Sequence, residues 1–293
     1  MLPRYKAADA RLRRRGGGRQ PLDGDDYEQI GRYYNRILHL RATPCVEKAL
    51  SPSWDRAGAQ RTYLERGSGI AVIDDFLTAD ALEELRAFCL ESTIWFANRY
   101  AHGRLGAFFH DGFTCPLLIQ IAEELGEELP AIFLPRYPLT QVWAFKNTRH
   151  LPAGSSMHAD FAAVTANLWI TPDSANTIPD QGGMTIYNVD APLHWDFVTY
   201  NGRADVILPF LASQGASSIT IPYRQNRAVV FNADLFHGTQ EVEFKPGYQN
   251  HRINVSWLYG RRENDAHHRA AHSPIVAGRK VRSWRSAGLR QGR

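Results

Sequence analysis

The sequence has few cysteines and no long apolar run. Its 293 residues include three cysteines, which lie far apart and form no CxxC pair: Cys45, Cys89 and Cys115. An odd number of separated cysteines cannot complete a disulfide framework, so we expect buried, reduced thiols and a cytoplasmic location. No run of about 18 uninterrupted apolar residues occurs, and we therefore expect no membrane span. The arginine-rich start is followed by glycine, proline and acidic residues, which predicts neither a secretory nor a twin-arginine signal.

Two other kinds of pattern are missing from the sequence. No repeat of about 20 to 50 residues is visible, which argues against a solenoid or a propeller. The pair Gly182 and Gly183 precedes a β-type run, and no helix with Lys, Ser or Thr at its start follows. These glycines therefore predict a tight turn or a bulge and not a phosphate-binding loop.

Positive charge is concentrated at the two ends of the chain. Residues 1–20 contain seven Lys/Arg against one acid, and residues 261–293 contain nine against two. The 240 residues between them contain 18 basic and 27 acidic side chains, although the whole chain has a net charge of +4. We expect a flexible basic arm over 1–25 and a basic tail over 263–293. The core shows no nucleic-acid footprint, whereas the two ends are either solvated or contact a polyanion.

The first half of the chain predicts helices. The expected elements are a helix over residues 27–40, a short strand over 70–73, a helix that begins after the N-cap Thr78 and a helix over 116–130. Apolar residues recur at helical spacing in each of these helices. Residues 26–135 therefore form the helical part of the predicted domain.

The second half predicts a β structure over residues 136–260. Short runs rich in Val, Ile, Thr and aromatic residues alternate there with Gly, Pro, Asn and Asp, and seven such runs occur. Seven strands after a helical half predict a mostly β fold, a barrel or jelly roll with flanking helices. The segment 191–216 interrupts the strands and is too long for a hairpin loop, so we expect a lid or a substrate-facing element.

A histidine and an aspartate lie two positions apart in the run MHADFAAV, residues 157–164. Side chains at i and i+2 of a strand point to the same face, so His158 and Asp160 converge if this segment is a strand. A neutral imidazole beside a carboxylate is half of a site for a divalent metal. An isolated pair of this kind is more often a hydrogen-bonded surface pair, so the metal interpretation needs a third ligand.

His237 and the last predicted strand supply further groups. His237 follows the β-type run RAVVFNA, 77 positions after Asp160. In the run HRINVSWLYG, Arg252, Asn254 and Ser256 share one face of a strand, and the apolar residues that alternate with them share the other. The apolar face suits packing. The polar face presents a cation and hydrogen-bonding groups to an interior that a small barrel leaves open for one ligand.

The order of these residues resembles that of the Fe(II)/2-oxoglutarate-dependent dioxygenases. His158 and Asp160 in an HxD pair, then His237, then Arg252 all lie on β-type segments, as in that family. The resemblance covers roughly residues 68–260. It includes the run GIAVIDDFLTADALEELRAF, which is similar to the opening of prolyl 4-hydroxylase-like members. The resemblance implies a double-stranded β-helix, which is a cupin-like jelly roll.

The resemblance also implies an oxygenase with a single domain over residues 26–262. Its Fe(II) ligands are expected to be His158, Asp160 and His237, a facial triad that leaves positions open for 2-oxoglutarate and O2. Such enzymes decarboxylate 2-oxoglutarate to succinate and oxidise an organic or protein substrate. Asp160 favours hydroxylation, because related halogenases have a small residue in its place.

Binding of 2-oxoglutarate is expected to depend on Arg252, whose planar guanidinium suits the distal carboxylate. Many relatives have serine or threonine two positions after this arginine, whereas this chain has Asn254, followed by Ser256. An amide donates the same hydrogen bond. Asn167 and Gln141 are further candidates for the other end of 2-oxoglutarate. Counted along a continuous strand, Asn167 faces away from the metal ligands, so it reaches the site only if the chain bends before it.

Two alternative functions remain open at the level of sequence. One is a cupin-like protein that binds a metal or a small acid without catalysis. The other is an adaptor that binds nucleic acid or another polyanion through its basic ends, a role that is also compatible with an oxygenase core. The sequence does not identify the substrate, because specificity lies in loops and in the insertion.

Overall fold

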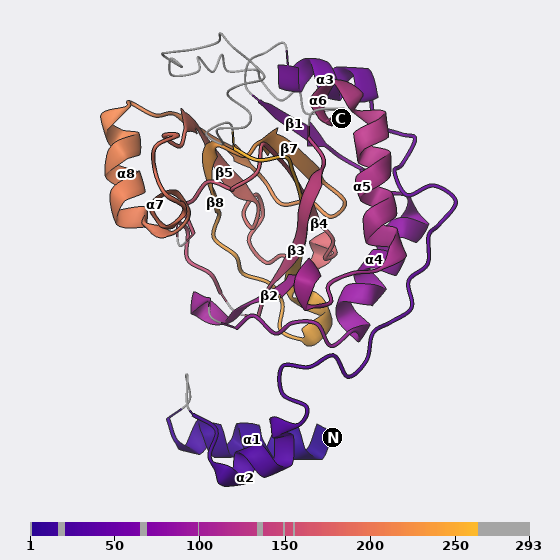
Figure 1. Ribbon diagram of the computed structural model, residues 1–293, viewed down its shortest axis with the longest axis vertical. Coiled ribbons are helices and arrows are strands. Elements are labelled where there is room, and N and C mark those ends of the chain that lie inside the picture. The colour runs from indigo at the N-terminus through magenta and orange to yellow at the C-terminus, as the bar shows by residue number, and fades with distance from the viewer. Residues whose placement is uncertain are drawn as a thin grey trace.

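The computed structural model describes residues 2–16, 21–64, 69–98, 100–133, 137–148, 150–154 and 156–262 (Figure 1). Within these ranges, nine strands form two antiparallel sheets, with the orders β1-β7-β4-β9-β3-β2 and β6-β5-β8. The strands of the larger sheet are β1 (Ile70–Ile73), β2 (Arg104–Phe108), β3 (Leu139–Asn147), β4 (Val164–Trp169), β7 (Ala228–Asn232) and β9 (Arg252–Tyr259). Those of the smaller sheet are β5 (Met184–Asp190), β6 (Ser218–Ile221) and β8 (Leu235–Thr239).

From β3 onward, the chain passes back and forth between the two sheets. β3 lies in the larger sheet, and the next segment forms an isolated bridge from His158 to His237 of the smaller sheet. β4 returns to the larger sheet, β5 and β6 lie in the smaller one, and β7, β8 and β9 alternate again. This path is that of a double-stranded β-helix, and the predicted jelly roll with flanking helices is confirmed.

Helices cover the outer face of the larger sheet. α4 (Ala79–Glu91) begins as predicted after the N-cap Thr78, whose hydroxyl accepts a hydrogen bond from the N–H of Ala81 at 3.3 Å. α4 and α5 (Pro116–Glu128) pack against this face with side chains of β3, β4, β7 and β9 in one large core (Figure 1). The inner face of the sheet is thereby turned toward the smaller sheet. Other short helices are α3 (Arg56–Leu64), α6 (Pro130–Phe133), η2 (Ala101–Gly103), η3 (Phe109–Asp111), η4 (Asp173–Ala175) and η5 (Tyr248–Asn250).

The N-terminal region differs from its prediction. The expected flexible arm contains the helix α1 (Leu2–Arg14), which contacts η1 (Tyr27–Gly31), and η1 in turn contacts α2 (Gly24–Asp26). An internal ion pair holds these short helices together. The fully buried carboxylate of Asp26 accepts hydrogen bonds from Arg11, at 2.7 Å, and from Arg15. The helix predicted over 27–40 ends at Gly31. In Figure 1 these short helices lie together at one end, apart from the sheets.

The insertion 191–216 carries two helices, α7 (Phe197–Gly202) and α8 (Ala204–Ser213), which lie beside the smaller sheet in Figure 1. Tyr200 and Leu211 from these helices pack in one cluster with Phe236 of β8. Arg262 stabilises the start of the insertion, because its Nη2 donates a hydrogen bond to the carbonyl of Ala191 at 2.8 Å. The insertion is thus a packed part of the domain, and its role toward substrate stays a prediction.

Two further predictions are corrected. The run MHADFAAV is not one strand, because His158 pairs in an isolated bridge, the chain bends over residues 161–163, and β4 begins only at its last residue, Val164. Cys45 is exposed, whereas Cys89 and Cys115 are buried as expected, and all three thiols are free.

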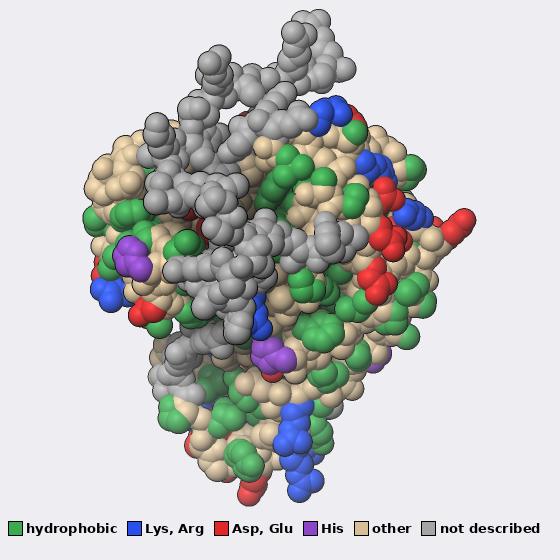
Figure 2. Space-filling view, turned by 45° about the horizontal axis from the view of Figure 1, so that its top comes forward, with side chains coloured by type: hydrophobic (Ala, Val, Ile, Leu, Met, Phe, Trp, Pro, Cys, Tyr) green, Lys and Arg blue, Asp and Glu red, His purple; other side chains and the backbone are tan. Residues whose placement is uncertain are grey.

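Charges on the domain surface are mixed in sign. On the face shown in Figure 2, acidic and basic side chains lie next to one another. Lys48 and Arg56 both pair with Glu128, at 2.9 and 3.0 Å. The predicted basic tail, residues 263–293, lies outside the described residues. In the described part of the chain, no helix is long and apolar enough to cross a membrane.

Candidate active site

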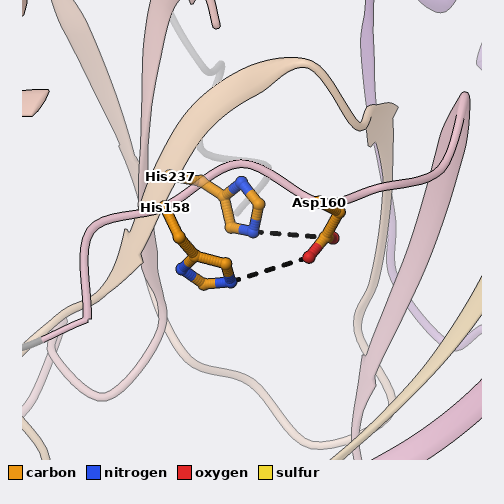
Figure 3. Close-up of side chains that lie close together, drawn as sticks. All are labelled: His158, Asp160 and His237. Atoms are coloured by element: carbon orange, nitrogen blue, oxygen red, sulfur yellow. Dashed lines mark ion pairs between the residues drawn. The ribbon is translucent and has the colours of Figure 1, made fainter. Parts of the chain in front are cut away.

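The three predicted metal ligands meet at one point (Figure 3). His158 and Asp160 lie in the loop between β3 and β4, and His237 lies in the middle of β8. Backbone hydrogen bonds of 2.9 and 2.8 Å join the two histidines in both directions, and their ring centroids lie 4.4 Å apart. Nε2 of His158 lies 3.6 Å from Oδ1 of Asp160, and Nε2 of His237 lies 3.7 Å from Oδ2. The ligand atoms all lie within 4.8 Å of one another, a spacing that suits one metal ion.

Both imidazole rings are held through Nδ1. In His158 this nitrogen donates to the carbonyl of Ser156 at 2.6 Å, and in His237 it donates to the carbonyl of Leu235 at 2.9 Å. A ring that carries its proton on Nδ1 has a free lone pair on Nε2, the atom that faces Asp160. Burial and, second, the neighbouring His237 lower the pKa of His158 to about 4, so this ring is neutral at pH 7.

Asp160 is 3% exposed and presents one carboxylate oxygen to each histidine. Its Oδ2 also accepts a hydrogen bond from the hydroxyl of Thr165 at 2.8 Å. Among the described residues, the ion-pair contacts of Asp160 are with the two histidines. A buried carboxylate without a full cation beside it is unfavourable. A divalent metal bound by the two Nε2 atoms and the carboxylate would supply the missing charge, so the residues fit such an ion.

Arg252 is a buried cation at the start of β9, 3% exposed. Its Nε donates to the carbonyl of Gly182 at 2.6 Å, and its Nη1 donates to Oδ1 of Asn254 at 3.0 Å. Burial lowers the pKa of Arg252 to about 9, so the side chain is still charged at pH 7. The ion pairs of the described residues include none with Arg252. A buried guanidinium whose hydrogen bonds go to neutral oxygens is suited to an anionic ligand.

Two amides and a hydroxyl line the cavity next to Arg252. Asn254 donates from Nδ2 to Oδ1 of Asn167 at 2.9 Å, and Ser256 donates to the same oxygen at 3.0 Å. The carbonyl oxygen of Asn167 is therefore occupied, and its N–H groups are available as donors. Asn167 reaches the cavity because the chain bends over residues 161–163, as the sequence required. Gln141 does not line the cavity, and its Oε1 accepts from the N–H of Val142.

The cavity around these groups has a volume of about 480 Å³, which includes solvent at its open side. Three buried N–H donors in it or beside it have no hydrogen-bond partner within the described ranges: Nε1 of Trp169, Nδ2 of Asn147 and Nε of Arg104. Because buried donors are normally paired, this excess of donors indicates that the cavity receives acceptor groups from a ligand.

Arg104 is the functional candidate that the sequence analysis missed. It lies at the start of β2, a strand that was not predicted, and it lines the same cavity as the metal ligands. The signal was the short alternating run RLGAF, which lies between two glycine-containing turns and was too brief to stand out.

Comparisons with known proteins give only distant similarity. No family model matches the chain, and no curated protein matches it. Similar solved structures include a Pseudomonas putida prolyl-4-hydroxylase, with 14% identity, a TM-score of 0.39 and coverage of 74% of this chain and 99% of that chain. HygX from Streptomyces hygroscopicus, solved with nickel, 2-oxoglutarate and hygromycin B, has 14% identity, a TM-score of 0.45 and coverage of 69% and 87%. A 2OG-Fe(II) oxygenase family oxidoreductase from Burkholderia pseudomallei has 12% identity, a TM-score of 0.42 and coverage of 76% and 96%.

Proposed function

We propose that this chain is a non-haem Fe(II)- and 2-oxoglutarate-dependent oxygenase that hydroxylates an organic or protein substrate. The observation that carries the proposal is that one cavity contains a buried carboxylate beside two imidazoles and, separately, a buried guanidinium. Among the described residues, the ion-pair contacts of Asp160 are with His158 and His237, and Arg252, in the same cavity, forms no ion pair. A divalent metal would pair with the carboxylate and the imidazoles, and a dicarboxylate would pair with the guanidinium.

The metal site has the ligand set of non-haem iron oxygenases, two imidazoles and one carboxylate. His158 and His237 would bind through Nε2, and their Nδ1 hydrogen bonds would fix the orientation of the rings. Asp160 would bind through the carboxylate that Thr165 holds. When bound, Fe(II) together with 2-oxoglutarate supplies the oxidising chemistry, in which O2 is consumed and 2-oxoglutarate is converted to succinate.

The cosubstrate site is centred on Arg252. This guanidinium would receive the distal carboxylate of 2-oxoglutarate, beside the unpaired donors of Trp169 and Asn147. Asn254 would act mainly on Arg252, because its Oδ1 accepts from the guanidinium and its Nδ2 is used by Asn167. Asn167 would then offer its own N–H groups to the end of the cosubstrate nearer to the metal.

The test is a spectroscopic titration without O2. Wild-type protein with Fe(II) and 2-oxoglutarate should give the weak visible charge-transfer band of such sites, and His158→Ala should abolish it. His110→Ala removes a histidine that is exposed, so this control should keep the band. Arg252→Gln should weaken 2-oxoglutarate binding roughly 30-fold or more, because a buried charge pair cannot form.

The proposal fails if the wild-type protein stays colourless with both additions and releases no succinate under O2. Metal binding without any 2-oxoglutarate turnover would instead favour the non-catalytic cupin-like protein. Binding of a polyanion by the basic ends, and a cytoplasmic location, are separate predictions that this titration does not touch.

A further inference from the structure

Arg104 is a second cation that lines the cavity, and among the described residues its guanidinium forms no ion pair. Its guanidinium carbon lies 3.9 Å from the ring centroid of Phe145 and 5.7 Å from that of Tyr100. Its Nε is buried without a hydrogen-bond partner, and the ion pairs of the described ranges include none with this side chain. Stacking on Phe145 covers one face of the guanidinium and leaves its N–H edge to recognise a ligand.

Strand register places Arg104 and Arg252 in one row across the larger sheet. Arg104 of β2 is paired with Asn147 of β3, and Asn147 is paired with Arg252 of β9. Residues paired in this way point to the same face, and two strand spacings separate their backbones by about 10 Å. Two cations in one row repel each other, and Arg104 contributes to the lowered pKa of Arg252. The arrangement is suited to two separate anionic groups.

A count of charges assigns one anion to each arginine. The charged side chains that line the cavity are Asp160, Arg104 and Arg252. The proposed Fe(II) and 2-oxoglutarate, a dianion, would balance Asp160 and Arg252 together with the charge of the metal. One positive charge, that of Arg104, then remains without a partner.

The geometry points to Arg104 as the residue that binds a carboxylate of the primary substrate, which is therefore an organic acid or a carboxylate-bearing side chain. This inference rests on the proposed function, because it takes the other anionic position as filled by 2-oxoglutarate. Nε–H and one Nη–H form a parallel pair that matches the two oxygens of a carboxylate. Trp143 and Phe145 also line the cavity, so the part of the substrate next to the carboxylate is apolar or flat.

Gly106 keeps room for this arrangement. It is paired with Phe145 in the register of β2 and β3 and lies two positions after Arg104, on the same face of the sheet. A Cβ at position 106 would lie 3.2 Å from the ring of Phe145 and 3.0 Å from that of Phe108. A larger residue would therefore displace the ring on which Arg104 rests.

Calorimetry on the full-length protein can test the assignment. The protein is saturated with Fe(II) and 2-oxoglutarate without O2 and titrated with benzoate, or with benzamide as a neutral probe of the same shape. We expect benzoate to bind wild-type protein roughly tenfold or more tightly than benzamide, the fold-change of one charged hydrogen-bonded pair. Arg104→Gln should lose this preference, and Arg104→Lys should keep part of it. Arg203→Gln, which removes an exposed arginine, should bind benzoate like the wild type.

A parallel titration with 2-oxoglutarate separates the two proposals and reports folding. Arg104→Gln should bind 2-oxoglutarate within about threefold of wild type, and Arg252→Gln should not. The inference is overturned if Arg104→Gln binds benzoate as the wild type does, or if wild-type protein does not prefer benzoate. It is also overturned if Arg104→Gln weakens 2-oxoglutarate as much as Arg252→Gln, since Arg104 then belongs to the cosubstrate site. If wild-type protein binds no 2-oxoglutarate at all, the proposed function itself fails.

Discussion

The two faces of the larger sheet serve different purposes, and β9 shows both in alternate residues. Arg252, Asn254 and Ser256 face the cavity and are joined to one another or to Asn167 by hydrogen bonds. Ile253, Val255 and Trp257, which alternate with them, lie in the large core against α4 and α5. All six are buried, so exposure alone does not distinguish them. The difference is that the cavity face has polar groups whose partners are incomplete, while the helix face is filled by apolar contacts.

Two buried cations make the comparison quantitative. Arg252 lies on the cavity face, and burial lowers its pKa to about 9. Lys146 of β3 lies one row away on the helix face, 2% exposed, with its Nζ 4.0 Å from the ring centroid of Tyr248 and 4.6 Å from that of Trp95. Burial lowers the pKa of Lys146 to about 7. A cation on the cavity face can gain a ligand, whereas the ammonium on the helix face lies, among the described residues, against the rings of Trp95 and Tyr248.

The largest expected effect concerns Lys146. Between pH 7 and the ordinary pKa of a lysine, the unfolded chain binds one more proton at this residue than the folded chain does. The free energy of unfolding of the wild type should therefore rise with pH in this window. The destabilisation that results from burying the charged Lys146 should be fully present below pH 7. Lys146→Met should raise the free energy of unfolding at pH 6 by about 2 to 5 kcal/mol. The gain should shrink toward pH 10.

Urea unfolding of wild type and variant at several pH values measures this difference. Subtracting the two curves removes the contributions of groups that do not interact with Lys146, such as Cys115, whose pKa burial raises. Lys245→Met makes the same replacement at an exposed lysine and serves as the matched control. A Lys146→Met variant that is less stable than wild type at pH 6 would mean that the two aromatic rings outweigh the desolvation of the ammonium.

The next effect separates stability from ligand binding. Val255 is fully buried on the helix face between Asn254 and Ser256, which point into the cavity. Val255→Ala should cost roughly 1.5 to 3 kcal/mol of unfolding free energy through lost apolar burial and a small cavity. The affinity for 2-oxoglutarate, measured by calorimetry below the unfolding transition, should stay within about twofold of wild type. A parallel loss of affinity would show that the two faces are not independent.

The same alternation explains how much of the site the sequence predicted. Arg252 and its neighbours on β9 were placed on one face because the side-chain period of a strand is local. His158 and Asp160 were expected to converge through that period, but they lie in a loop, and the convergence with His237 comes from the bridge between the two histidines. The three side chains lie close together as expected, but strand periodicity is not what brings them together, and their role as metal ligands stays a prediction.

Features that depend on distant pairing were missed. β2 is an edge strand whose partner, β3, follows more than 30 positions later, and Arg104 gains its place in the cavity only through that pairing. His237 was placed only as following the run RAVVFNA, and its own strand, β8, was not delimited. Helix α1 was missed because its arginine-rich sequence does not predict the tertiary contact with Asp26 that holds it. The helices of the insertion were missed because a Pro-containing sequence does not predict packing against Phe236. The bend before Asn167 was recognised as a requirement and could be located only in three dimensions.

The smallest expected effect lies on the cavity face, at Thr165. Its hydroxyl donates to the oxygen of Asp160 that faces His237, and both side chains are buried. Thr165→Val keeps the shape and removes the donor, so the carboxylate is free to rotate away from the histidines. We expect Fe(II) affinity to fall about tenfold, the usual effect of losing a hydrogen bond to a metal ligand. Thr220→Val, on the exposed side of β6, should leave the affinity unchanged. An anaerobic Fe(II) titration decides the matter: if Thr165→Val binds Fe(II) as tightly as wild type, Asp160 is held by the fold of its loop and not by this hydroxyl.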